Sequence, residues 1–312
     1  MKPRLACVVV LISLSLAPGT GRSDADKPAP VFDPTSNYEP RALAGFTVLV
    51  NRKALAHEAI TREALELLEE KLAEVVRILS PEQLKPLRGV RVWVEWEQTA
   101  GAAQYHVSAD WLQSHGYNPE KAGDMEISNV SHFTQWTRDA QPMMVLHELA
   151  HAYHNKVLGR DHAGIRKAYE QAVKDNRYES VPYVGGGLKR AYALNNDQEY
   201  FAETTEAYFG VNDYYPFTRP ELRDFDPVGY RLMEDVWGKK KDDVHLTVVN
   251  VTKQEALLYW VNGRKLIFYA RIKPGEEAKQ NTFVGHKWQA IFPDDGGQTF
   301  TAPGFDTTRR LR

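Results

Sequence analysis

Cysteine is almost missing from this sequence of 312 residues, because its one cysteine, Cys7, lies close to the start of the chain. Residues 1–22 have the order of a secretory signal peptide, in which Lys2 and Arg4 precede an apolar run over residues 5–17. Removal of that segment leaves a chain without cysteine. Disulfide bonds, cysteine nucleophiles and thiolate metal sites are therefore excluded from the mature protein, which must be held together by its core alone.

Long hydrophobic runs are also missing after the N-terminal segment. The run over residues 5–17 is itself shorter than the roughly 20 residues that a membrane-spanning helix needs. Small and turn-forming residues follow it at 18–21, although a clean A-x-A cleavage site is absent. An uncleaved membrane anchor is the alternative interpretation. We expect a secreted or periplasmic protein with no stable membrane insertion after signal cleavage.

A large charge of either sign is the third absence. The net charge is −2 and no basic stripe is present, which argues against nucleic acid as a partner. The hydrophobic content of 43% and the charged content of 26% are typical of a globular protein. The length is sufficient for two domains.

The most informative stretch runs from His147 to His151 and has the letters HELAH, an H-E-x-x-H motif typical of zinc peptidases. Two histidines four positions apart project from one face of a helix, so both can reach one metal ion. Glu148 points to the same place, where it can take a proton from water activated by the metal. We therefore predict a helix over residues 142–158, ended by Gly159, that holds one Zn²⁺ per chain.

A zinc ion held by two histidines needs a third protein ligand. Within a second predicted helix, over residues 197–209, Glu199, Glu203 and Glu206 share one face. An exposed acidic stripe is the alternative, but the apolar neighbours favour metal ligands or groups that support them. Helix faces alone leave Glu206 open as a ligand. His154 could also face the metal, and we interpret it as a supporting or surface residue.

The region over residues 142–210 resembles the peptidase domain of the anthrax lethal factor family, which includes the Pro-Pro endopeptidases. Two short motifs carry the resemblance: HELAH, and a tyrosine, Tyr192, seven residues before the segment EYFAE that begins at Glu199. The resemblance implies that Glu199 is the third zinc ligand and that Glu203 orients a ligand histidine. It also implies that Tyr192 donates a hydrogen bond to the developing oxyanion. Tyr200 stands where the family usually has phenylalanine.

Hydrophobic periodicity predicts further elements around these motifs. We expect strands over residues 46–50 and 90–95 and a long helix over residues 56–79. A short strand over residues 124–128 precedes the zinc helix, where the resemblance places a sheet edge that pairs with an extended substrate. The polar tract over residues 160–190 favours a mobile flap.

These elements predict a fold of two parts. The signal peptide over residues 1–22 and a flexible leader over residues 23–45 come first. An α+β zincin-like metallopeptidase domain is expected over residues 46–238. A small all-β sandwich domain is expected over residues 239–312, where short strands are punctuated by glycine and proline.

Part of this C-terminal domain resembles the β-domain of the von Hippel–Lindau tumour suppressor, with no gaps from Tyr269 to Trp288. In that family the domain binds a hydroxyproline peptide. The matching contact positions are Tyr269, Thr282 (serine in the family), His286 and Trp288. Together they could form a small prolyl pocket with polar groups at its end. Alternatively, Trp260 and Trp288 are core residues and His286 is a turn residue.

These expectations combine into a secreted zinc endopeptidase with a C-terminal peptide-docking domain. Its partner would be a peptide or protein substrate, proline-rich or containing hydroxyproline. The alternative is an inactive peptidase scaffold that acts as a peptide-binding protein, and a zinc hydrolase of another class is a third possibility.

Two triplets fit the N-glycosylation pattern of secreted proteins. They begin at Asn129 and Asn250. Such triplets often occur by chance, so they carry little weight.

Overall fold

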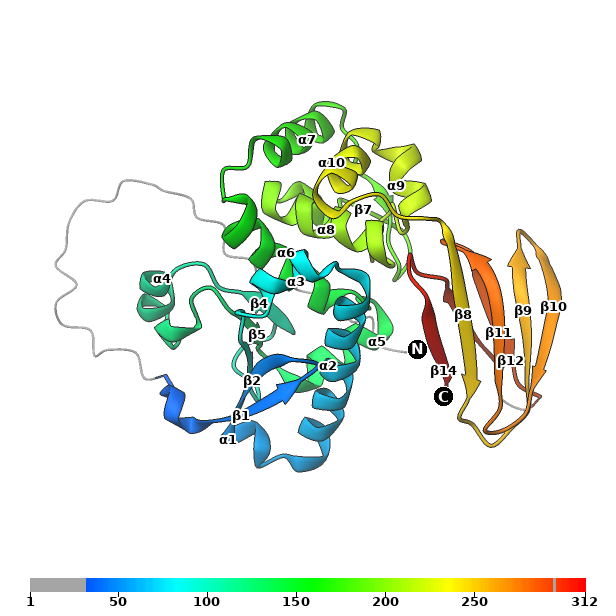
Figure 1. The fold of residues 1–312 in the computed structure, drawn as a ribbon, viewed down its shortest axis with the longest axis horizontal. Helices are drawn as coiled ribbons and strands as arrows, with labels where there is room; N and C mark the ends of the chain where they lie inside the picture. The colour runs from blue at the N-terminus through cyan, green and yellow to red at the C-terminus, as the bar shows by residue number, and fades with distance from the viewer. Residues whose placement is uncertain (1–31, 294–295) are drawn as a thin grey trace. The chain divides into compact units, whose positions relative to one another are not determined.

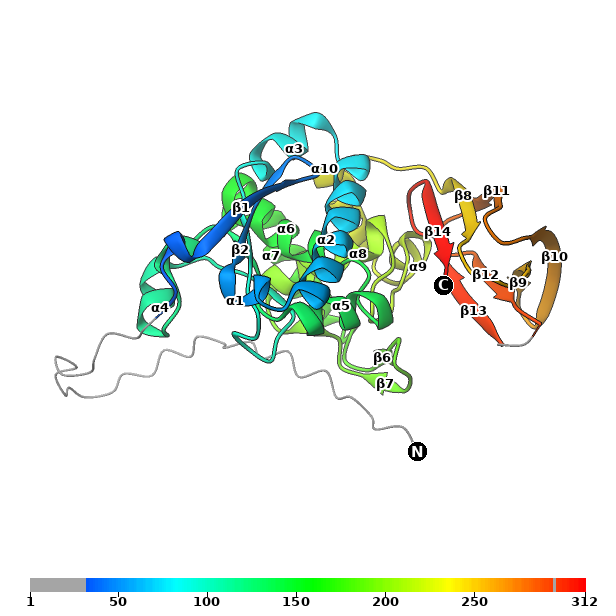
Figure 2. The ribbon, with the colours of Figure 1, turned by 90° about the horizontal axis from the view of Figure 1, so that it is seen from below.

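The computed structural model describes residues 32–293 and 296–312. The expected signal peptide lies outside these residues, as does the first part of the expected leader. The described part is a mixed α/β structure with helices and several small sheets (Figures 1 and 2). None of the helices in this part of the chain has the length and apolar character that a bilayer span requires.

The chain forms two compact units. Of the described residues, the first contains those up to Asp139 together with His151–Arg160, and the second contains Ala140–Ala150 and those after Arg160. The division runs through helix α6 (Met144–Tyr153), so this helix belongs to both units.

A five-stranded mixed sheet forms the centre of the first unit, with the order β1-β2-β3-β5-β4. Its strands are β1 (Tyr38–Leu43), β2 (Phe46–Asn51), β3 (Val92–Val94), β4 (Ala103–Tyr105) and β5 (Met125–Ile127). The three central strands are parallel, and β1 and β4 are antiparallel to their neighbours. The expectation that residues 124–128 form a sheet edge is therefore wrong, because β4 covers that side of β5.

Strand β1 corrects the expected flexible leader over residues 23–45. It pairs with β2 along its whole length, from Tyr38 opposite Asn51 to Leu43 opposite Phe46. The sequence does not predict this strand, because its residues lack the alternation of apolar and polar side chains. An edge strand can be exposed along most of its length and tolerates proline.

Helices lie between and after the strands of this sheet along the sequence. The predicted long helix is confirmed as α2 (Glu58–Ile78), whose apolar residues are buried along one face. Four shorter helices accompany it: α1 (Arg52–Leu55), α3 (Pro81–Leu87), α4 (Ala109–Ser114) and α5 (Val130–Asp139).

A buried ionic network fixes the polar interior of the first unit. The Nζ atom of Lys121 lies 2.6 Å from carboxylate oxygens of both Glu95 and Glu126, and its side chain is 1% exposed. His106 contacts the same Glu126 carboxylate at 3.0 Å. Burial lowers the pKa of Lys121, but the two carboxylates outweigh burial and raise this pKa above its usual range. The lysine is therefore a permanent cation inside the unit.

The second unit contains the first part of α6 and the helices after Arg160, whereas the end of α6 and the turn that follows it belong to the first unit. Helix α6 continues into a π-helical turn, His154–Leu158, which ends at Gly159 with φ 84°. This confirms the predicted helix and its glycine end, because a left-handed φ favours glycine. Then follow α7 (Ala163–Lys174), the hairpin β6 (Val181–Pro182) and β7 (Leu188–Lys189), α8 (Asp197–Phe209), α9 (Arg219–Phe225) and α10 (Pro227–Trp237).

Helix α7 shows that the polar tract over residues 160–190 is not a continuous flap. Only three residues of this helix, Ile165, Ala168 and Ala172, are buried. Two of them are alanines, so the apolar stripe is too weak to detect among the charged residues. Helix α8, by contrast, has the bounds that the sequence predicts.

The C-terminal β-domain, residues 243–312, contains two sheets with a shared core. The first has the order β10-β9-β12-β13 and the second β11-β8-β14. Apolar residues of both sheets, such as Val248 and Trp288, belong to one buried cluster, which agrees with the expected all-β domain. Its strands are β8 (Asp243–Asn250), β9 (Ala256–Asn262), β10 (Lys265–Ile272), β11 (Glu277–Phe283), β12 (Lys287–Ile291), β13 (Gly297–Thr301) and β14 (Thr307–Leu311).

Arg219 joins this β-domain to the helices of the same unit. Its side chain is fully buried and donates to the backbone carbonyl of Tyr208 at 2.9 Å and to Asp242 at 2.9 Å. The backbone amide of Gly304 donates to the carbonyl of Phe209 at 2.8 Å. A Cβ atom at Gly304 would lie 2.7 Å from the backbone carbonyl oxygen of Phe209, so only glycine permits this approach. These bonds explain why no compact unit ends near the domain boundary expected at residue 238.

The two glycosylation triplets are not accessible. Asn129 is 6% exposed and Asn250 is fully buried. The Asn129 side chain accepts hydrogen bonds from the backbone of Ser131 and His132, and the Asn250 amide donates to the carbonyls of Gln254 and Ile272. Both side chains therefore have structural roles.

The ionic network makes Lys121 a test of the first unit. Replacement of Lys121 by methionine leaves two buried carboxylates without their cation, so we expect the free energy of unfolding to fall by about 3–5 kcal/mol. Urea denaturation followed by circular dichroism measures the change. The matched control Lys85→Met, at an exposed position of α3, should change stability by less than about 0.5 kcal/mol. Equal stability of the two variants would contradict the role assigned to the network.

Candidate metal centre

Helices α6 and α8 supply the candidate ligands. His147 and His151 lie one turn apart on α6, and Glu199 lies in the first turn of α8. The Asn196 side chain accepts hydrogen bonds from the backbone of Gln198 and Glu199 and so fixes the start of α8. His147, His151 and Glu199 each offer one ligand atom, and these atoms all lie within 4.8 Å of one another. The structure thus assembles the three ligands that the sequence predicts.

His147 is held between two carboxylates. Its Nε2 atom lies 3.1 Å from Glu199 and its Nδ1 atom 2.6 Å from Glu206, while its side chain is only 12% exposed. Burial lowers the pKa of His147, but the bonds to Glu199 and Glu206 outweigh burial and hold this pKa well above its usual range. Without a metal, both ring nitrogens therefore carry protons.

The donor set fits zinc. Two imidazoles and one carboxylate are ligands that Zn²⁺ accepts, and three protein ligands are the number found in catalytic zinc sites. Tetrahedral zinc would hold neighbouring nitrogen and oxygen ligands roughly 3.4 Å apart, given bond lengths of about 2.0–2.2 Å. The separation of 3.1 Å between His147 and Glu199 is close to this value.

Glu206, and not Glu203, contacts the imidazole of His147. The resemblance assigned this role to Glu203, but its carboxylate accepts a bond from Asn212 at 3.2 Å. Burial raises the pKa of Glu203 well above its usual range, and the nearby Asp213 and Glu206 add to this effect. Burial thus favours the protonated form of Glu203. It still lies close to the site, because His147, Glu203 and Glu206 form a second group of potential ligand atoms within 4.8 Å.

Three further polar residues behind His147 were not predicted. Asp213 is 3% exposed and accepts a bond from Gln141 at 3.3 Å. Burial raises the pKa of Asp213 to about 7, with a further contribution from Glu206. Asn212 supports Glu203. The loop that carries Asn212 and Asp213 has no periodic pattern, so no sequence signal distinguishes them from other loop residues.

The predicted catalytic residues accompany the ligands. Glu148 is 7% exposed on α6 between the two histidines. The ring of Tyr192 lies 6.4 Å from the ring of His147, in the turn Tyr192–Leu194 just before α8. Burial raises the pKa of Tyr192, and the charges of Glu199 and Glu148 raise it further. Tyr192 therefore keeps its proton and remains a hydrogen-bond donor.

His154 is not a surface residue. It is 2% exposed and lies in the π-helical turn after α6. It belongs to neither group of potential ligands among the described residues. The change from α-helix to π-helix alters the register of the chain after Tyr153, so an α-helical spacing of seven from His147 does not apply to His154.

The four expected contact residues of the β-domain come together. Thr282 Oγ1 lies 3.1 Å from His286 Nδ1 and accepts a bond from the Trp288 indole at 3.2 Å. The Tyr269 ring packs edge-on against Trp288 at 4.8 Å. Trp288 is 1% exposed and Thr282 is 3% exposed, whereas Tyr269 is 40% exposed. Trp288 is therefore a core residue, as the alternative held, although it also borders this cluster.

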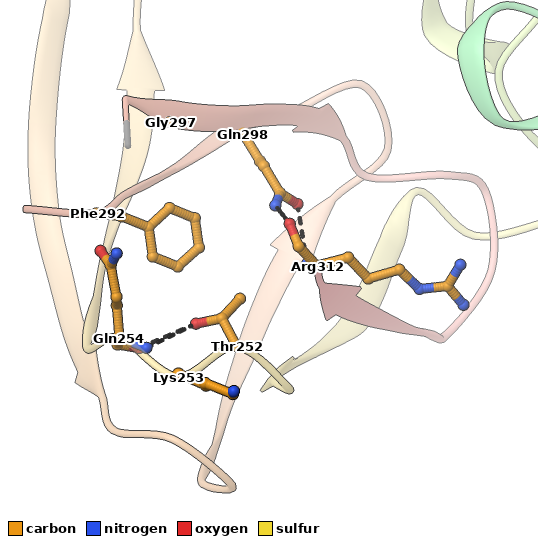
Figure 3. A pocket seen from close by; sticks show the side chains of 7 residues that line it. All are labelled: Thr252, Lys253, Gln254, Phe292, Gly297, Gln298 and Arg312. Carbon is orange, nitrogen blue, oxygen red and sulfur yellow. Dashed lines mark hydrogen bonds between the residues drawn. The ribbon is translucent and has the colours of Figure 1, made fainter. Parts of the chain in front are cut away.

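A separate hollow of about 250 Å³ lies elsewhere in the β-domain (Figure 3). Its lining includes Gln254, Phe292 and Gln298, and Gln298 donates to the backbone carbonyl of Arg312. None of the predicted ligand or contact residues lines it. This hollow therefore adds nothing to the metal centre.

Comparison of the sequence with known protein families and with curated proteins finds no match.

The contacts of His147 separate the roles of Glu206 and Glu203. Glu206→Gln removes the carboxylate from Nδ1, so we expect the affinity for Zn²⁺ to fall by about 10- to 100-fold. Glu203→Gln leaves the bond between Glu206 and His147 in place, so it should change the zinc affinity by less than about threefold. Competition with a fluorescent zinc chelator measures both affinities. A larger loss of zinc affinity in Glu203→Gln than in Glu206→Gln would show that Glu203 orients the histidine, as the resemblance implies.

Proposed function

We propose that the protein is a secreted zinc-dependent endopeptidase of zincin-like fold. The observation that carries the proposal is the convergence of ligand atoms from His147, His151 and Glu199 within 4.8 Å. Glu148 and Tyr192 lie beside these ligands, as the chemistry of peptide hydrolysis requires.

Each residue has a defined task in this proposal. Zn²⁺, when bound, supplies a Lewis acid that polarises a peptide carbonyl and acidifies a water molecule. Glu148 accepts the proton of that water and passes it to the leaving amine. Tyr192 donates its hydroxyl proton in a hydrogen bond to the oxyanion. Glu206 fixes the orientation of the His147 ring through Nδ1.

Two alternatives assign the same helices another function. An inactive scaffold that only binds peptides needs neither a buried Glu148 nor a Tyr192 that keeps its proton, so both residues favour catalysis. A zinc hydrolase of another class would use the same ligands. The resemblance over residues 142–210 favours peptide bonds, and a substrate screen separates the two classes.

We also propose that the β-domain docks proline-containing peptides. The observation that favours this second function is the cluster of Tyr269, Thr282, His286 and Trp288. An exposed tyrosine ring offers an apolar wall for a prolyl ring. The Thr282 hydroxyl and the His286 imidazole offer polar partners for a hydroxyl on that ring.

Zinc content and Glu148 test the peptidase. We expect about one zinc per chain by elemental mass spectrometry, and loss of peptide cleavage on chelation. Glu148→Gln should retain zinc and lower kcat by at least about 100-fold. Glu170→Gln, at an exposed position of α7, is the matched control and should retain full activity. A folded zinc-free protein, or full cleavage by Glu148→Gln, would refute the proposal.

The prolyl pocket is tested with one peptide in two forms. We expect the Glu148→Gln chain to bind a hydroxyproline peptide about tenfold more tightly than its proline form, as one buried hydrogen bond predicts. His286→Ala should abolish this preference and Tyr269→Phe should retain it, because the phenylalanine ring keeps the apolar wall. Fluorescence anisotropy measures the affinities. Equal affinity of the parent protein for both peptides would exclude recognition of the hydroxyl.

A further inference from the structure

The four-stranded sheet of the β-domain has an apolar outward face. Successive side chains of a strand point to opposite faces, and Leu258 and Trp260 of β9 belong to the core. Tyr259 and Val261 therefore point outward. The strand register places Phe268 opposite Tyr259 and Leu266 opposite Val261 on the same face. A sheet with one face in water usually has polar residues there, so this face departs from the usual pattern.

The apolar side chains of this face are accessible. Leu266 is 45% exposed and Phe268 is 54% exposed. Figures 1 and 2 show β10, which carries both residues, as the strand of the β-domain farthest from helices α8–α10 of the same unit. We call this set the outer face; its apolar members are Leu257, Tyr259, Val261, Leu266, Phe268 and Ile291.

Basic residues predominate along β9, β10 and the turn that joins them. Residues 256–275 contain four arginines and lysines and no aspartate or glutamate. Arg271 is paired with Glu255 at 2.9 Å. Lys287 lies on the outer face itself, because it pairs with Val261 in the register. The face therefore combines apolar side chains with a positive fringe.

We propose that the outer face docks on an anionic lipid surface. Aromatic and aliphatic side chains enter the boundary between headgroups and acyl chains, and basic side chains bind anionic headgroups. The backbone of β9 is paired on both sides, so much of the face enters the boundary without unpaired backbone groups. The protein would lie on the membrane and not span it.

A second copy that extends the sheet along the edge of β10 fits less well. In a symmetric antiparallel pair of β10 strands centred on Phe268, Lys265 of one copy would lie opposite Arg271 of the other. Like charges directly opposite in a sheet destabilise the pairing. An acidic protein partner is the remaining candidate, but the outer face is a plain sheet surface, whereas peptide recognition usually uses side-chain pockets.

The docking surface is independent of the peptidase proposal. None of its residues is a metal ligand, and none belongs to the cluster of Tyr269, Thr282, His286 and Trp288. Glu148→Gln should therefore bind lipid like the parent protein, while outer-face variants should retain hydrolysis of a soluble peptide. Failure of one proposal leaves the other intact.

Vesicle co-sedimentation of the full chain provides the test. The parent protein should bind phosphatidylcholine vesicles with roughly one third phosphatidylglycerol at least about tenfold better than pure phosphatidylcholine vesicles. High salt should weaken this binding. Leu266→Ser/Phe268→Ser and Arg264→Gln/Lys265→Gln should each lower the partition coefficient by about tenfold.

Matched controls lie on another element. Val173→Ser replaces a residue of α7 that is 43% exposed, and Lys174→Gln removes an exposed cation beside it; neither should change vesicle binding. The proposal is overturned if anionic vesicles bind no better than neutral ones, or if the outer-face variants bind like the controls. Light scattering that shows a dimer lost in Leu266→Ser/Phe268→Ser, without vesicle binding, would assign the face to a second copy instead.

Discussion

The imidazole of His147, held between two buried carboxylates, is the interaction on which the candidate centre depends. Glu199 and Glu206 come from one helix and His147 from another, so these two bonds fix α8 against α6. A buried carboxylate without a partner costs several kcal/mol. In the absence of a metal, the protonated imidazole supplies the positive charge that both acids need. These bonds thus hold the candidate ligands His147 and Glu199 together without a metal.

The same arrangement links metal binding to protons. A metal ion bound to His147 would displace a ring proton, so its binding would release that proton. Glu203 and Asp213, whose pKa values are raised chiefly by burial, stand behind His147 as acids that need no counter-ion while they stay neutral. A high pKa in two of them allows residues 199–213 to bury four carboxyl groups, those of Glu199, Glu203, Glu206 and Asp213.

The sequence predicted the parts of the site that depend on local spacing. The HELAH motif and the helix over residues 197–209 follow from fixed intervals on an α-helix, so both helices and the pair of His147 and His151 could be predicted, whereas the choice of Glu199 rested on the resemblance. Positions four and seven residues after Glu199 lie on neighbouring parts of one helix face. Periodicity therefore could not choose between Glu203 and Glu206, and tertiary packing decides. Strand β1 and helix α7 were missed because an edge strand and an alanine-rich stripe leave weak apolar patterns.

The bonds of Arg219 and Gly304 have a consequence for any peptide that binds both the helices and the β-domain of the second unit. Arg219 and Gly304 tie the β-domain to the end of α8, the helix that carries Glu199. A peptide anchored near Tyr269 would then meet the metal helix at a set number of residues from its anchor. The unit would act as a ruler, selecting the cleaved bond by its spacing along the chain as well as by the residues around it.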